Sequence, residues 1–239
     1  MRSWTVRSTD ILNGKATGVH RLRSVPLMRL PVALANVHWS TAPGDVVEWE
    51  LPAKARVDDV VVGAGFERID HTRARRVRTL PDTVGPHMRV LVCGLNPSLV
   101  AADAGFGFAG ATNRFWPAAA ESGLLTRVRD PLHALQVDGV GMTDLVKRAT
   151  KGTVDLAPDE YRSGAQRVER LVRWLRPPVV LFVGLEGWRA AVDRRAQPGW
   201  QPSRFGAAKP YVMPSTSGLN AHARLADLVD HIRAAIGEV

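Results

Sequence analysis

The 239-residue chain carries 32 Lys and Arg residues against 23 Asp and Glu residues, which gives a formal net charge of +9. Such a charge favours polyanionic partners, so nucleic acid is the first partner to consider, although a merely arginine-rich soluble protein has the same composition. The single cysteine, Cys93, excludes an internal disulfide, a cysteine-based zinc site and an iron–sulfur cluster with four cysteine ligands.

The first part of the chain has a weak α/β pattern. Residues 31–37 predict a helix, residues 46–51 alternate like a strand, and residues 57–62 predict a short helix. An arginine-rich run follows, with Arg73, Arg75, Arg76 and Arg78. These arginines either bind DNA without sequence preference or are simply solvated. We place a domain boundary after this run, with a small N-terminal α/β region over residues 1–84 and the main domain over residues 85–239.

The main domain has clearer signals. Residues 89–94 and 179–184 are continuous apolar runs that end in glycine, which predicts buried parallel strands. Apolar residues recur at helical spacing over residues 158–176 and predict a crossover helix. A strand at residues 211–213 then leads to a final helix. This alternation predicts a three-layer α/β/α sandwich with a mainly parallel central sheet.

Two loops follow predicted strands, at the edge where sheets of this kind bind ligands. In residues 94–98, Gly-Leu-Asn-Pro-Ser, a glycine and a proline would hold Asn96 in a tight turn that projects into the crevice. Asn-Pro is also a common turn dipeptide, so this loop alone does not identify a functional asparagine.

The second loop, residues 213–220, reads Met-Pro-Ser-Thr-Ser-Gly-Leu-Asn. Its three hydroxyls beside a helix N-terminus suit a phosphate, while Leu219 is either a staple to the following helix or a wedge for a base stack. A third stretch, Gly-Phe-Gly-Phe-Ala-Gly at residues 105–110, offers Phe108 as a stacking face. Phe115 and Trp116 are expected to belong to the core.

Together and in this order, these segments resemble the mismatch-specific uracil/thymine DNA glycosylase family of the uracil-DNA glycosylase superfamily. Residues 94–98 are similar to the family motif Gly-Ile-Asn-Pro-Gly, and residues 105–116 to Gly-Phe-x-Phe-Ala followed by Asn-Arg-Phe-Trp. Residues 141–146 resemble Gly-(Val/Leu)-Thr-x-(Leu/Ile)-Val, and residues 214–219 the second family motif. Ser98 stands where the family has glycine, so the shape of the first turn differs from the family pattern.

The resemblance implies a role for each matched residue. Asn96 would position the attacking water, Phe108 would stack on the extruded base, and the backbone around Gly94 and Leu95 would contact the base edge. Leu219 would fill the vacated place in the duplex. The DNA-contacting residues would be Ser215, Thr216, Ser217, Gly218, Leu219 and Asn220.

The implied activity is that of a monofunctional DNA glycosylase, which flips uracil out of a G:U mismatch and hydrolyses its N-glycosidic bond, with other modified pyrimidines as further substrates. Asn96 has a neutral amide that orients water without accepting its proton, so we expect fast release of uracil and slow or absent release of thymine. The partner would be double-stranded DNA containing uracil or a mismatch.

The remaining expectations concern the location, oligomeric state and cofactors of the protein and its alternative functions. No stretch approaches the ~20 apolar residues of a membrane span, and we expect a cytoplasmic monomer that needs no cofactor and no metal. Two alternatives stay open: a glycosylase for another deaminated base, such as hypoxanthine, and a non-catalytic protein that binds lesions or nucleic acid. The role of residues 1–84 is undetermined.

Overall fold

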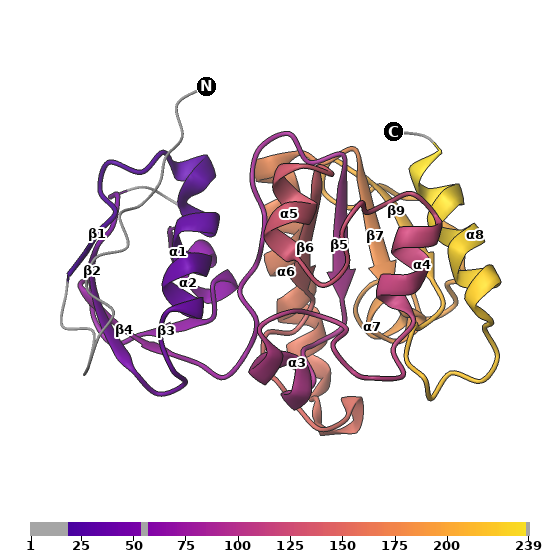
Figure 1. The fold of residues 1–239 in the computed structure, drawn as a ribbon, viewed down its shortest axis with the longest axis horizontal. Coiled ribbons are helices and arrows are strands. Elements are labelled where there is room, and N and C mark those ends of the chain that lie inside the picture. The colour runs from indigo at the N-terminus through magenta and orange to yellow at the C-terminus, as the bar shows by residue number, and fades with distance from the viewer. Residues whose placement is uncertain (1–18, 54–56, 238–239) are drawn as a thin grey trace.

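The computed structural model of the protein describes residues 19–53 and 57–237. It contains two β-sheets, one in the N-terminal region and one in the rest of the chain, each packed against its own helices (Figure 1). The predicted α/β class with a small N-terminal α/β extension is therefore confirmed. The boundary between residues 84 and 85 stays a prediction.

The N-terminal sheet has the strand order β1-β2-β4-β3, with β1 parallel to β2 and the other pairs antiparallel. Its elements are β1 (His20–Arg21), the 3-10 helix η1 (Leu27–Arg29), α1 (Leu30–Trp39), β2 (Val46–Glu50), α2 (Val57–Gly63), β3 (Phe66–Arg68) and β4 (Arg73–Arg76). Alternation along β2 sends Val47 and Trp49 into a core shared with α1 and α2. The two helices and the strand that the sequence predicts here are all present.

The second sheet has the order β6-β5-β7-β9-β8 and is parallel except for β8, which runs antiparallel to β9. Its strands are β5 (Val90–Gly94), β6 (Val140–Asp144), β7 (Val179–Val183), β8 (Gly199–Trp200) and β9 (Lys209–Met213). Every residue of β5 and β7 is buried, as expected for central parallel strands covered on both faces.

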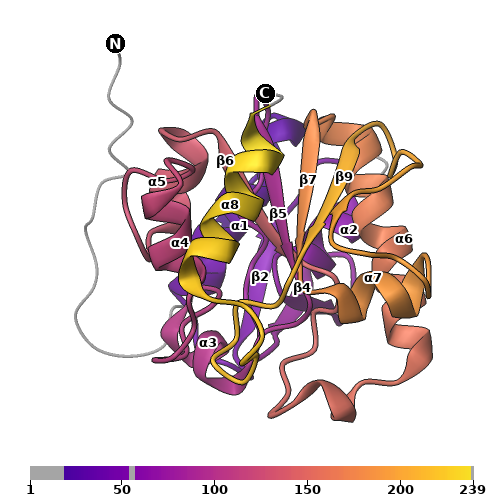
Figure 2. The same ribbon diagram turned by 90° about the vertical axis from the view of Figure 1, so that its right-hand side faces the viewer.

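Helices cover both faces of this sheet (Figures 1 and 2). The helices are α3 (Leu99–Ala104), α4 (Phe115–Glu121), α5 (Pro131–Gln136), η2 (Thr153–Asp155), α6 (Pro158–Leu175), α7 (Leu185–Ala191) and α8 (Leu225–Ile236). One core joins α4 and α8 to the sheet, and the other joins α6 and α7 to its opposite face. The three-layer sandwich is confirmed. Phe115 and Trp116 are buried in the first core, as predicted.

The parallel strands all end at one edge of the sheet. Gly94 of β5 pairs with Asp144 of β6, and Val183 of β7 pairs with Met213 of β9, so the segments that follow these strands meet at this edge. In Figure 1, α3 lies below the same edge. Within the described ranges, no helix is both long and apolar enough to cross a bilayer.

Candidate active site

Two cavities, of about 220 and 340 Å³, lie at the carboxyl edge of the second sheet. Both are lined by Leu95, Asn96 and Phe108. Gly94 lines only the smaller cavity. The loop after β9 lines both, with Ser217 and Gly218 at the smaller cavity and Ser215, Thr216, Ser217 and Leu219 at the larger one. The structure thus brings the three segments singled out in the sequence around one site, and the functions assigned to their residues stay predictions.

The Asn96 side chain is fixed by hydrogen bonds from its amide nitrogen. Asn96 Nδ2 donates to the carbonyl oxygen of Arg148 at 3.0 Å and to Thr150 Oγ1 at 2.8 Å. Because a carbonyl can only accept, the nitrogen must face Arg148, which leaves Asn96 Oδ1 as the acceptor on the other side of the amide. The hydroxyl of Thr150 donates in turn to the carbonyl oxygen of Gly152 at 2.8 Å.

The backbone around Asn96 is tied to the same neighbouring segment. Thr150 N donates to Pro97 O at 3.1 Å, and Leu99 N donates to Thr150 O at 3.3 Å. Ser98, the departure from the family motif, begins α3: its hydroxyl accepts a hydrogen bond from Ala101 N at 3.1 Å. Serine at this position is therefore explained as an N-cap, which stabilises the start of α3.

Phe108 has a backbone with φ of 58°, a left-handed conformation that is unusual for a phenylalanine. Its ring stacks on Phe115 with centroids 4.1 Å apart and an interplanar angle of 24°. One face of Phe108 is therefore covered by the core, and the ring also lines both cavities. This geometry suits a platform on which a planar base stacks.

A carboxyl group enters the smaller cavity beside Gly94. A Cβ atom at Gly94 would lie 2.6 Å from Asp144 Oδ1 and 3.5 Å from Phe108 Cζ, so glycine is required for the carboxyl to lie there. Burial raises the pKa of Asp144 to about 6, although the positive charges of Lys147 and Arg167 oppose this rise. Near pH 6 the group can therefore act either as a hydrogen-bond donor or as an acceptor.

The loop after β9 is stabilised by hydrogen bonds between its own residues. Ser215 Oγ accepts from Ser217 N, and Ser217 Oγ accepts from Leu219 N, both at 3.3 Å. Asn220 Nδ2 donates to Ser215 O at 2.8 Å, so the Asn220 amide closes the loop. The two serine hydroxyls keep their protons for donation to an anionic oxygen such as that of a phosphate.

The tip of this loop is exposed. Leu219 has 96% of its surface accessible, whereas Gly218 is pressed against Thr112. A Cβ atom at Gly218 would lie 2.5 Å from Thr112 Cβ, so a side chain at this position would displace the tip. Thr216 is buried, with 1% of its surface accessible, and its assignment as a DNA-contacting residue stays a prediction.

A family model of the Uracil DNA glycosylase superfamily matches residues 81–236 of the chain. The chain belongs to this superfamily. Membership assigns it a general role as a DNA glycosylase, a hydrolase of base excision repair whose substrate is DNA. The match includes every predicted site residue and begins after nearly all of the N-terminal α/β unit.

No motif in the sequence indicates how this glycosylase holds the loop after β9. Arg114 Nη2 donates to the carbonyl oxygens of Ser217 and Asn220, both at 2.8 Å, and Nη1 donates to the carbonyl oxygen of Ala223. The backbone N of Arg114 also donates to Thr216 O at 2.9 Å. Arg114 belongs to the Asn-Arg-Phe-Trp segment of the sequence, but nothing in that segment indicates which carbonyls its guanidinium reaches.

Asp144 and Thr150 were also missed as site residues. Asp144 occupies the variable position of the motif at residues 141–146, and the register of β5 and β6 places it beside Gly94. Thr150 lies outside every segment with a recognisable motif. Among residues 19–53 and 57–237, no group of three or more His, Cys, Asp and Glu side chains is arranged to hold a metal ion.

Proposed function

We propose that this chain is a monofunctional glycosylase of the mismatch-specific type, which releases uracil from G:U pairs in double-stranded DNA. The observation that carries the proposal is the fixed orientation of Asn96, whose Nδ2 is bound to Arg148 O and Thr150 Oγ1. Its Oδ1 is then available to accept a hydrogen bond from a water molecule in the cavity. Holding a nucleophile in this way removes much of the entropic part of the barrier.

The target base must leave the duplex before it can reach this water, at a cost of a few kcal/mol that is smallest for a mispaired base. Leu219, at the exposed tip of its loop, would enter the space that the base leaves. Ser215 and Ser217 would donate to phosphates beside the lesion, which positions the strand without reading sequence. Phe108 would receive the flipped base on its free face.

Cleavage of the glycosidic bond leaves negative charge on the departing base. A protonated Asp144 would donate a hydrogen bond to a carbonyl oxygen of that base and so stabilise the charge, whereas the ionised form would repel it. Because Asn96 cannot take a proton from water, the reaction depends on this stabilisation and on the quality of the leaving group. Uracil therefore reacts faster than thymine in this proposal.

The test is base release from an end-labelled duplex with one G:U pair, followed by alkaline cleavage of abasic sites under single-turnover conditions. We expect release by the parent protein and a loss of about 100-fold or more in Asn96→Ala. Asn36→Ala, which removes an exposed amide from α1, is the matched control and should retain the parent rate.

The same assay on duplexes with other base pairs defines the range of substrates. We expect release from G:T to be slow or absent, and an equal rate on G:U and G:T would contradict the proposed dependence on the leaving group. Release from a hypoxanthine duplex without release from G:U would favour the glycosylase for another deaminated base. Tight binding to G:U without release of any base would favour a non-catalytic lesion-binding protein.

A further inference from the structure

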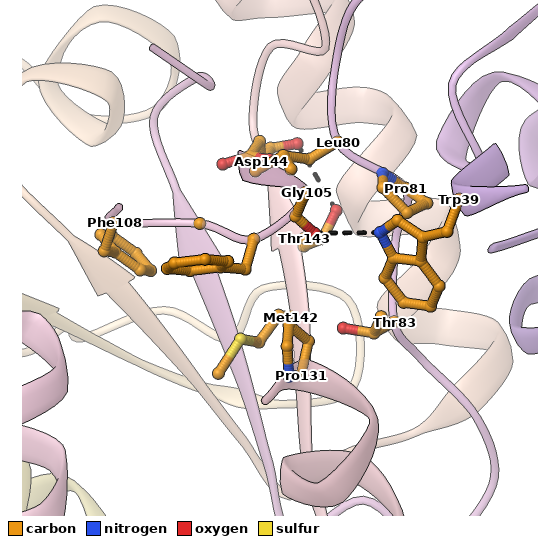
Figure 3. A pocket seen from close by; sticks show the side chains of 12 residues that line it. Trp39, Leu80, Pro81, Thr83, Gly105, Phe108, Pro131, Met142, Thr143 and Asp144 are labelled. Atoms are coloured by element: carbon orange, nitrogen blue, oxygen red, sulfur yellow. Dashed lines mark hydrogen bonds between the residues drawn. The ribbon is translucent and has the colours of Figure 1, made fainter. Parts of the chain in front are cut away.

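The N-terminal α/β unit reaches the active-site edge through Trp39, the last residue of α1. Trp39 Nε1 donates a hydrogen bond to Gly105 O at 2.9 Å. The indole also lies close to this glycine, since a Cβ atom at Gly105 would be 3.4 Å from both Trp39 Cδ1 and Nε1. Figure 3 shows Trp39 and Phe108 lining one small cavity, with Gly105 between them.

A second indole binds the same segment. Trp116 of α4 donates from Nε1 to Gly107 O at 2.9 Å, two residues after the carbonyl that Trp39 binds. The segment between these two bonds leads directly into Phe108, whose left-handed backbone needs support from its surroundings. One of the two supports belongs to the superfamily domain, and the other is contributed by the N-terminal unit.

The N-terminal unit also contacts the segment that orients Asn96. Thr79, which follows β4, donates from Oγ1 to the carbonyl oxygen of Lys147. Asp82 binds the same residue through its side chain, with Lys147 Nζ 2.8 Å from Asp82 Oδ1. The next carbonyl along the chain, that of Arg148, is the one that accepts from Asn96 Nδ2.

Arginines of the arginine-rich run are paired inside the protein, and one of them reaches the main domain. Arg76 is buried, with Nη2 3.0 Å from His38 Nε2, and Arg78 forms an ion pair with Asp103 of α3. Burial lowers the pKa of His38 to about 3, with the nearby Arg76 charge acting in the same direction, so the imidazole is neutral. Three of the four arginines thus have partners within the protein, since Arg73 also forms an ion pair, and the pair made by Arg78 joins the N-terminal unit to the main domain.

From these contacts we propose that the N-terminal α/β unit is a positioning element of the active site, and that Trp39 sets the Gly105–Gly110 segment so that Phe108 meets the flipped base. Trp39 touches neither base nor sugar in this proposal and acts only through the segment it holds. A supporting residue of this kind keeps the reacting geometry within a fraction of an ångström. The inference rests on the proposed glycosylase function.

The test compares two tryptophans that both join the N-terminal unit to the main domain. Trp174 of α6 packs against the cores of both units but does not line any cavity at the active-site edge. We expect Trp39→Ala to lower the single-turnover rate on a G:U duplex by about 10- to 100-fold with little change in duplex affinity. Trp174→Ala should lower the melting temperature and leave the rate of folded protein unchanged.

A second readout does not depend on activity. Hydrogen exchange of the amides in residues 105–110 should accelerate in Trp39→Ala and stay unchanged in Trp174→Ala. Trp39→Phe keeps a ring against Gly105 and removes the N–H donor, and it replaces the alanine variant if that variant does not fold. Its amides in residues 105–110 should also exchange faster than those of the parent, by a smaller factor than in Trp39→Ala. Absence of base release by the parent would reject the glycosylase function, while the exchange data would still decide the role of Trp39.

Two results would overturn the proposal. An unchanged rate and unchanged exchange in Trp39→Ala or Trp39→Phe would mean that the segment holds its shape without the indole. Equal loss of rate in the Trp39 and Trp174 variants would mean that general docking of the two units matters and that Trp39 has no specific positioning role.

Discussion

Two loops face each other across the site and are built in opposite ways. The Asn96 loop, residues 94–98, is bound on several sides, because Asn96 Nδ2, Pro97 O and Ser98 Oγ all have hydrogen-bond partners. The Leu219 loop, residues 214–220, is held at its base by Arg114 and by hydrogen bonds within the loop, and its tip is almost fully exposed.

This difference fits the two tasks that we propose for these loops. An amide that orients water works only if its own position is set before the substrate arrives, which hydrogen bonds from a neighbouring segment achieve. A wedge must instead leave the protein surface and enter another molecule, so its apolar side chain has no place in the core. The loops therefore respond differently to substitution, and the predictions below test that contrast from the largest effect to the smallest.

Thr150→Val should give the largest effect, because it removes the nearer of the two acceptors described for Asn96 Nδ2 and leaves the shape of the side chain nearly unchanged. We expect the single-turnover rate on G:U to fall by about 10- to 100-fold, since small misplacements of a reacting group cost that much. Thr150→Ser retains a hydroxyl and is the control. Full activity of the valine variant would show that Arg148 alone orients Asn96.

Asp144 should make activity depend on pH in a definite direction. If the protonated carboxyl assists the leaving base, kcat/KM falls about tenfold per pH unit above the pKa of about 6, and Asp144→Asn removes this dependence. Asp193→Asn, which changes an exposed aspartate, should keep the parent profile. A rate that rises above pH 6 would contradict the assignment and indicate a carboxylate that activates water.

The Asp144 carboxyl should also make the stability of the protein depend on pH. Its pKa of about 6 in the folded protein exceeds the ordinary value of 3.8, so the folded state binds the proton more tightly than the unfolded state does. The free energy of unfolding therefore decreases as pH rises between these two values. Above pH 6, Asp144→Asn should be more stable than the parent by on the order of 1–3 kcal/mol, measured by denaturant unfolding. A parent that is the more stable of the two at pH 7 would contradict the raised pKa.

Leu219→Ala should lower the single-turnover rate on G:U by a few-fold while the melting temperature stays within about 1 °C, because an exposed side chain contributes little to folding. Val137→Ala changes another exposed apolar residue, far from the site, and should alter neither quantity. If Leu219→Ala released uracil at the parent rate from G:U and A:U duplexes, the wedge would be unnecessary.

The smallest effects should appear in the salt dependence of DNA binding. Lys151 is exposed and lines the larger cavity, so Lys151→Gln should reduce the slope of log K against log salt by about one unit. Arg75 is exposed on the N-terminal sheet, away from that cavity, and Arg75→Gln should leave the slope unchanged. A reduced slope in Arg75→Gln would restore the idea of a DNA grip by the arginine-rich run.

Much of the fold could be predicted because its signals are local. The crossover helix expected over residues 158–176 is α6 (Pro158–Leu175), since periodic apolar residues and flanking prolines define a helix without reference to other parts of the chain. The buried strands β5 and β7 were recognisable as apolar runs for the same reason. Short elements such as α3 and η2 escaped prediction, because a helix of one or two turns has too few residues to show a period.

The sequence by itself determined the α/β class, the two strand-end loops and the family resemblance, and with them the prediction that Asn96, Phe108 and Leu219 are site residues. Only the tertiary structure decided that Thr150 orients Asn96 across 54 residues of chain, and that Trp39 supports the Phe108 segment across 66. The physical reason is that a strand or helix follows from neighbouring residues. A hydrogen bond between distant segments depends instead on how the sheet and the two units bring those segments together.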